Sequence, residues 1–122
     1  MNVQRFEDLI AWQKSRVLAA DIYRAVGLGP MARDFGLKDQ MQRAAVSVMA
    51  NIAEGFERRS PADFARFLTT AKASCAGLKS HLFLAMDVGY LETELFRKLQ
   101  DQSEEVNRII GGLRSSLNAK PQ

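Results

Sequence analysis

Five basic side chains in the middle of the chain have the type and spacing needed to bind phosphate. Between residues 64 and 86 the charged side chains are Arg66, Lys72 and Lys79, with no Asp or Glu among them, and Arg58 and Arg59 come just before. Phosphate binding needs clustered cations, because each neutralised phosphate releases condensed counterions. Lys72 and Lys79 are one heptad apart and share a helix face, whereas Arg66 points elsewhere. This segment predicts a nucleic-acid contact, and an ordinary solvated helix face is the alternative.

A second set of polar residues interrupts the apolar stretch AAVSVMANIAEG, residues 44–55. At 100° per residue these polar positions form one narrow seam on a helix whose remaining circumference is mostly apolar. Four helices in a square cannot enclose one of their own members, so we expect part of this surface to pack on a second copy of the chain. The alternative is that this helix is simply the most buried one of a monomer.

The seam would hydrogen-bond across a helix contact, with Glu54 able to pair with Arg43 or Arg58, and would set partner choice more than stability. The predicted contact comprises Gln40, Arg43, Ser47, Asn51 and Glu54 of the seam, and Ala45, Met49, Ala53 and Phe56 of the adjacent apolar face.

No combination of residues indicates catalysis or metal binding. His81 is the only histidine, and no Cys, Asp or Glu stands three or four positions away to complete a metal site. Cys75 falls within an apolar helical stripe, which favours packing over reactivity. Glu54 is the only acid of the polar seam, which does not support an acid–base pair. We therefore expect no enzymatic activity, no metal and no cofactor.

Long helices must position these residues, because four segments show helical periodicity and none shows strand alternation. In Ser60-Pro61-Ala62-Asp63, Ser60 can cap a helix that begins at Pro61. The glycines and proline of GLGPMARD separate the first two segments. Short connections between long helices predict an all-α fold, an antiparallel up-and-down four-helix bundle that spans residues 1–122 as one domain. The expected helices are Glu7–Val26, Leu37–Arg58, Pro61 to near Gly89, and Thr93–Leu117.

The composition agrees with one intracellular domain. The chain has 122 residues, 47% hydrophobic and 25% charged, and its net charge of +3 permits nucleic-acid binding without requiring it. The single cysteine excludes an intrachain disulfide and fits a reducing compartment. MNVQRFEDL lacks the apolar run of a signal peptide, and no apolar run approaches the roughly 18 residues of a membrane span. We expect a cytoplasmic protein without a membrane partner.

The chain also resembles a known family. FEDLIAWQKS, LKDQMQRAAVSVMANIAEG and SPADFARFLTTAKAS are similar to the four-helix-bundle proteins encoded within intervening sequences of bacterial 23S rRNA genes. The chain departs from the family pattern Ser-Leu-x-Glu-Leu-Glu, because Gly77 and Lys79 stand at its two acidic positions. The most specific matching residues are Gln40, Arg43, Ser47, Asn51, Glu54 and Gly55, followed by Phe64, Phe67, Leu68, Ala71 and Ser74.

That family in turn resembles the accessory protein of diversity-generating retroelements, a bundle that forms a ring of five with a positively charged central channel and binds RNA and a reverse transcriptase. The resemblance implies a non-enzymatic homo-oligomer, a homopentamer, with an RNA- or DNA-binding accessory role and a reverse transcriptase as a candidate partner. Five copies would multiply a weak local charge around one axis. The alternative function is a protein-interaction scaffold that contacts no nucleic acid.

Overall fold

The computed structural model describes residues 3–118, which form four long α-helices and two short 3₁₀ helices and contain no β-strand. The all-α class and the four helices predicted from periodicity are therefore confirmed. The largest difference in helix bounds is at the first helix, because Leu9 is extended and separates a 3₁₀ turn from the α-helix. The elements are η1 (Phe6–Asp8), α1 (Ile10–Val26), η2 (Gly29–Arg33), α2 (Phe35–Glu57), α3 (Pro61–Asp87) and α4 (Thr93–Asn118).

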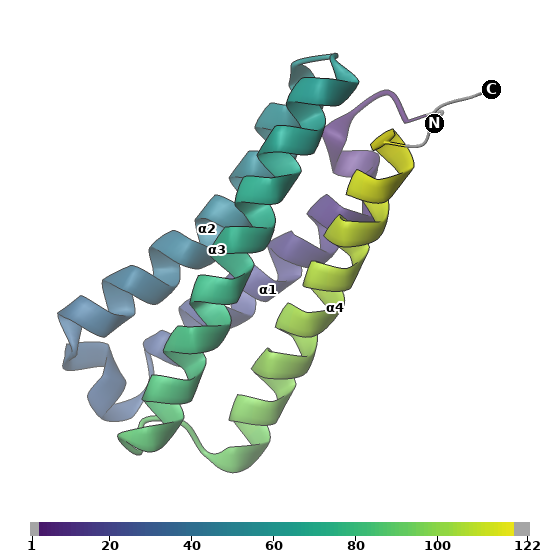
Figure 1. Cartoon of the computed structure of the whole chain (residues 1–122). Coiled ribbons are helices and arrows are strands. Elements are labelled where there is room, and N and C mark those ends of the chain that lie inside the picture. Colours follow the sequence, from purple (N-terminus) through teal and green to yellow (C-terminus); the bar gives the residue numbers. More distant parts are fainter. Residues whose placement is uncertain (1–2, 119–122) are drawn as a thin grey trace.

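Each long helix of the bundle packs against two others (Figure 1). α2 packs on α1 and α3, and α4 packs on α3 and α1; the α2–α3 contact is the most extensive and the α1–α4 contact the least. The α2–α3 connection lies at one end of the bundle, together with the start of α1 and the end of α4 (Figure 1). The α1–α2 and α3–α4 connections lie at the opposite end. Each helix thus has a core face, two flanks against neighbours and an outer face.

Side-chain caps determine where two of the helices begin. Oγ of Ser60 accepts a hydrogen bond from the Asp63 backbone N–H at 3.3 Å, and Pro61 is the first residue of α3, as predicted. Oδ1 of Asp34 accepts from the Leu37 N–H at 3.1 Å, which starts α2 earlier than expected. Oδ2 of Asp34 accepts from the Tyr90 hydroxyl at 2.9 Å and so joins the two connections at that end. This hydrogen bond raises the pKa of Tyr90.

The core is one continuous apolar cluster to which all four long helices contribute. Ile22, Ile52, Leu78 and Leu99 are completely buried. Met31 is completely buried as well, although it lies in GLGPMARD, the segment that separates the first two long helices. The reason is that η2 folds this segment back onto α2. The connection between the first two helices is therefore part of the packed structure.

The second apolar face of α2 is only partly available to another copy of the chain. Ala45 and Phe56 are 1% and 8% exposed, and Phe56 packs edge-to-face on Phe64 with ring centroids 5.8 Å apart. Met49 and Ala53 are half-buried. The prediction that this face lies outside a single bundle is wrong for Ala45 and Phe56, because the contacts of α2 with α1 and α3 already enclose it on two sides.

Gly55 allows α2 and α3 to approach each other closely. A Cβ added to Gly55 would lie 2.5 Å from Cβ of Phe67 and 3.0 Å from Cδ1 of Phe64. Distances this short would force the phenylalanines, or α3 itself, away from α2. Gly77 is a contrasting position in the middle of α3, because nothing lies within 4 Å of a Cβ added there.

We expect Gly55→Ala to lower the free energy of unfolding by about 1–3 kcal/mol, the usual cost of overpacking a core. Gly77→Ala is the matched control and is expected to raise stability by up to about 1 kcal/mol, because alanine restricts the unfolded chain and favours helix. Urea denaturation followed by far-UV circular dichroism measures both changes. A Gly55→Ala protein as stable as the wild type would contradict the close α2–α3 packing.

Candidate nucleic-acid interface

The structure divides the five predicted phosphate-binding side chains into two groups. Lys72 and Lys79 lie on the flank of α3 that faces α4, where each contacts an α4 residue. Arg58, Arg59 and Arg66 are exposed at the α2–α3 turn and in the first turns of α3. The five side chains do not form one basic face.

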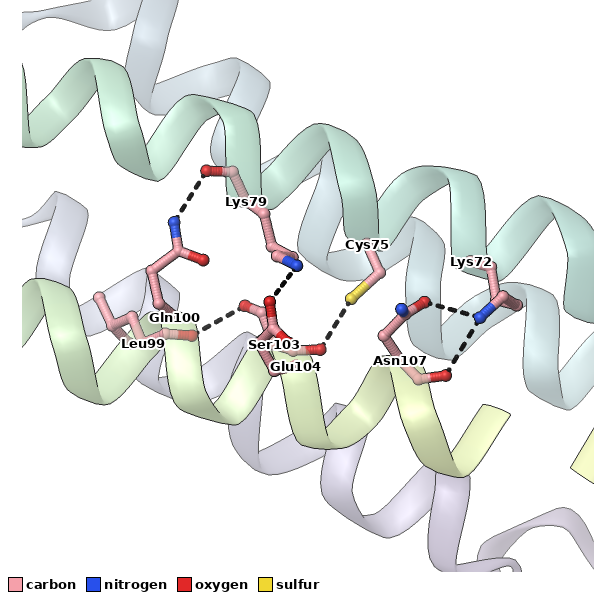
Figure 2. A network of polar contacts seen from close by, with 8 residues as sticks. All are labelled: Lys72, Cys75, Lys79, Leu99, Gln100, Ser103, Glu104 and Asn107. Carbon is pink, nitrogen blue, oxygen red and sulfur yellow. Dashed lines mark hydrogen bonds and ion pairs between the residues drawn. The ribbon is translucent and has the colours of Figure 1, made fainter. Parts of the chain in front are cut away.

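The two lysines already have partners within the chain (Figure 2). Nζ of Lys72 donates to the backbone oxygen of Asn107 at 3.4 Å and to its Oδ1 at 3.1 Å, and lies beside Gly111, where an added Cβ would be 3.2 Å away. Lys79 forms an ion pair with Glu104, and its side chain is only 26% exposed. The segment 64–86 contains no acid, but α4 supplies one. The lysines are therefore weaker candidates for phosphate binding than the arginines.

A buried polar contact lies between the two lysines (Figure 2). Sγ of Cys75 donates to the backbone oxygen of Ser103 at 3.2 Å, and Oγ of Ser103 donates to the backbone oxygen of Leu99 at 2.8 Å. Both residues are completely buried, and burial raises the pKa of the Cys75 thiol. The prediction that Cys75 is a packing residue is confirmed. The role of Ser103 was missed, because its environment depends on α3.

Two of the arginines rest on aromatic rings. The guanidinium carbon of Arg58 is 5.1 Å from the ring centroid of Phe67, and that of Arg59 is 4.8 Å from the ring centroid of Phe56. Cation–π attraction holds a guanidinium against the ring while its N–H groups stay available at the edge. The α2–α3 turn thus presents two arginines whose positions are restricted before any ligand binds.

Two of these arginines, Arg59 and Arg66, also form ion pairs with nearby carboxylates. Arg59 has a left-handed backbone, with φ of 59°, and its side chain donates to the backbone oxygen of Gln4 at 3.3 Å and lies 3.8 Å from a carboxylate oxygen of Glu57. Arg66 forms an ion pair with Asp63, one turn earlier in α3. These pairs are exposed and contribute little to stability, so they leave the arginines able to exchange partners.

An aromatic cluster near the start of the chain lies at the same end of the bundle. Phe6 packs edge-to-face on Trp12 with ring centroids 5.2 Å apart, and Arg16 lies 5.5 Å from the Trp12 ring. Phe6 and Phe67 line the same surface hollow, although 61 positions separate them in sequence. Sequence reasoning had no signal for this juxtaposition, because it depends on the packing of η1 against α2.

The polar seam of α2 forms hydrogen bonds with α3 of the same chain. Oγ of Ser47 and Oγ of Ser74 are 2.8 Å apart, and Nδ2 of Asn51 donates to the backbone oxygen and Oγ of Ser47 at 2.8 and 3.0 Å. Seam residues thus bond across a helix contact as expected, but the partner helix belongs to the same bundle.

The seam residues Gln40, Arg43 and Glu54 are exposed. Nε of Arg43 donates to Oδ2 of Asp39 at 2.8 Å, and Arg58 lies over Phe67. The predicted pairing of Glu54 with Arg43 or Arg58 is therefore not formed, because each arginine has a nearer partner on its own helix or on α3.

Within residues 3–118 no group of three or more His, Cys, Asp or Glu side chains is placed to hold a metal ion. His81 is half-buried and lines a hollow with Leu37, Leu84 and Tyr90 at the opposite end of the α2–α3 pair from the arginines. In the same part of the chain, none of the helices has an apolar stretch long enough to cross a membrane.

The Lys79–Glu104 ion pair predicts a pH dependence of stability. The hydrogen bond from Lys79, together with its charge, lowers the pKa of the Glu104 carboxyl below the ordinary value of 4.5. The folded state thus favours the carboxylate, so this stabilisation is fully present above that ordinary pKa and is lost as the pH falls through the lower folded-state pKa. We expect the stability advantage of the wild type over Glu104→Gln to disappear under acid conditions in thermal unfolding at a series of pH values.

Asp101→Asn, an exposed change on the same helix, is the control and should not reproduce this pattern. A difference between wild type and Glu104→Gln that is constant across the acid range would contradict the ion pair.

Known proteins resemble this chain in fold and in sequence. One solved crystal structure, a protein of unknown function from the S23 ribosomal protein family of Bacteroides thetaiotaomicron, is similar with a TM-score of 0.79 and 24% sequence identity, over 86% of this chain and 98% of that one. At this identity the likeness shows the fold alone. No curated protein matches. Residues 7–112 match the family described as 23S rRNA-intervening sequence protein, and the chain belongs to that family.

Proposed function

We propose that this chain is an antiparallel four-helix subunit of a homo-oligomer with a non-enzymatic, nucleic-acid-binding accessory role. The observation that carries this proposal is the α2–α3 turn, where Arg58 and Arg59 are exposed and lie over aromatic rings. Arg66, in the second turn of α3, is exposed nearby. Arginine is well suited to such a role, because its planar fork recognises phosphate and stacks on rings. RNA is proposed as the nucleic acid because the family resembles the RNA-binding accessory protein of diversity-generating retroelements; the family description itself names an intervening sequence and no ligand.

The distribution of exposed apolar side chains supports self-association. In the described chain, the large hydrophobic residues that are exposed all lie on α1, α2, α3 or their connections, and α4 has none. Surface of this kind marks a contact with another molecule when it is contiguous. We infer that α4 faces solvent and that the other three helices supply the subunit contacts. The residues are Ile10, Val17, Tyr23, Leu28, Phe35, Val46, Phe83, Leu84 and Val88.

A ring of five is the assembly that the family resemblance implies. Such a ring would repeat each α2–α3 turn around one axis, so that three arginines per subunit act together on one strand. Multivalent binding of this kind exceeds the affinity of any single turn when the geometry allows simultaneous contacts. Multivalent binding would therefore compensate for the weak attraction that a net charge of +3 per chain gives.

The proposed subunit contacts can be tested by introducing one carboxylate into the exposed apolar surface. We expect the wild type to have a mass that is a multiple of 13.6 kDa in light scattering, and Val46→Glu to reduce that mass while helix content is unchanged, because a carboxylate would be buried without a partner in the contact. Ser115→Glu, on the outer face of α4, is the control and should keep the wild-type mass. A folded wild type that remains at 13.6 kDa at every concentration would overturn self-association.

Nucleic-acid binding can be tested by charge reversal at the turn. We expect wild-type affinity for a single-stranded RNA to fall steeply as salt rises, because contacts with several phosphates release counterions. Replacing both Arg58 and Arg59 by Glu should lower the affinity at least about tenfold at low salt and make the salt dependence shallower. Fluorescence anisotropy of a labelled strand measures both effects.

The matched control replaces Arg97 and Arg108, on the outer face of α4, by Glu, which makes the same change in net charge. An equal loss in both double variants would show that binding is not directed by the α2–α3 turn. The absence of binding at low salt would remove the nucleic-acid role altogether.

The second candidate is a scaffold that binds another protein, such as a reverse transcriptase, and no nucleic acid. The exposed apolar side chains of α1–α3 are equally suited to this role, because the surface that could contact another copy could also receive a different polypeptide. A stable oligomer that binds no RNA or DNA at low salt would favour this reading.

A further inference from the structure

The hollow that Phe6 and Phe67 share has aromatic walls and an acidic rim. It measures about 620 Å³ and is lined by residues from η1, α2, the α2–α3 turn and α3. Apolar atoms form most of its surface. The lining residues are Phe6, Ala53, Glu54, Glu57, Arg58 and Phe67.

Contacts behind the hollow hold both aromatic rings in place. Phe67 packs closely on α2 because Gly55 has no side chain that would displace its ring. Phe6 is held by its edge-to-face contact with Trp12. The Arg58 guanidinium covers part of the Phe67 ring at 5.1 Å. The aromatic surface is therefore preorganised, which lowers the entropic cost of binding a flat ligand.

Glu54 is the acid of this rim that is open to a ligand. Glu57 lies 3.8 Å from Arg59, whereas none of the hydrogen bonds and ion pairs among residues 3–118 engages Glu54. Glu54 is exposed. An ionised carboxylate offers two acceptor oxygens and no donor, so the ligand that suits it presents two neighbouring N–H donors.

We propose that this hollow binds an unpaired guanine base of a single-stranded nucleic acid, an inference that rests on the nucleic-acid-binding role proposed above. Bases of single strands stack on aromatic rings and on arginine planes; here the exposed guanidinium of Arg58, supported by the Phe67 ring beneath it, would offer one such plane and Phe6 another. The Watson–Crick edge of guanine carries the N1–H and N2–H donors side by side, which match the two oxygens of Glu54. In adenine and cytosine an acceptor nitrogen occupies the corresponding ring position, and it would face the carboxylate unfavourably.

The charges around the hollow favour a neutral base over the side chain of a basic protein partner. Arg58 already covers the Phe67 face, so a second cation there would meet a like charge. A base carries no net charge and therefore does not repel the Arg58 guanidinium or the Glu54 carboxylate. The phosphates on either side of the base can reach Arg58 and Arg59 at the turn. A base already paired in a duplex cannot bind in this way, because its Watson–Crick edge is occupied.

The test uses uridine octamers that carry one central G, A or C. At low salt the G octamer should bind the 122-residue chain about tenfold more tightly than the other two, within the range expected for a bidentate base contact. Trp12 is the only tryptophan and touches Phe6, so its fluorescence reports binding beside the hollow, and labelled octamers give anisotropy as a second measurement. Glu54→Gln should abolish the preference for G, because the G octamer loses its bidentate contact while the A and C octamers lose an unfavourable one, whereas Glu94→Gln on α4 should leave the preference intact.

A second variant separates stacking from edge recognition. Phe67→Leu should weaken all octamers several-fold, because it removes the ring that holds Arg58 in place and stacking does not depend on the base, while Phe96→Leu, a half-buried aromatic on α4, should weaken none. Circular dichroism verifies that each variant is folded.

The outcomes distinguish this inference from the proposed function. If no octamer binds, the nucleic-acid role fails. If all octamers bind equally and Glu54→Gln changes nothing, the role stands and the guanine site is wrong. If Glu54→Gln changes the mass of the oligomer but not the base preference, the carboxylate belongs to a subunit contact, which also overturns the guanine site.

Discussion

The close packing of α2 on α3 at Gly55 is the constraint on which the candidate site depends. Because no Cβ stands at this position, Phe64 and Phe67 pack directly on α2, and Phe56 completes the aromatic contact from the other helix. The short turn that follows must then place its two arginines over those same rings. A bulkier residue in place of Gly55 would separate the helices and would also move the surface that the arginines use.

The same packing decides which charges remain available. Lys72 and Lys79 are held against α4, where Asn107 and Glu104 satisfy them, and the buried Cys75 lies between them. Charges that are paired across a helix contact stabilise the bundle and attract distant phosphates less than unpaired ones do. Part of the positive charge that α3 carries in sequence is therefore paired with α4, whereas the arginines near the α2–α3 turn are exposed.

The bundle also has two different sides. The outer face of α4 is charged and carries no large exposed hydrophobic residue, whereas α1, α2 and α3 each expose apolar side chains such as Val17, Val46 and Leu84. A monomer has no physical need for this asymmetry, since all four outer faces meet the same solvent. It agrees with the proposed homo-oligomer, in which α4 faces solvent and the other three helices supply the subunit contacts.

Patterns along the chain were enough to predict the four helices and the family. Hydrophobic repeats at helical spacing act along one segment, so they located α1–α4, and the Ser60 cap marked the start of α3 correctly. The pairing between segments, such as Glu104 beside Lys79 and Phe6 beside Phe67, became known only from the folded chain. Such pairings depend on which helix flanks meet in three dimensions, and a one-dimensional pattern carries no information about the flank of a neighbour.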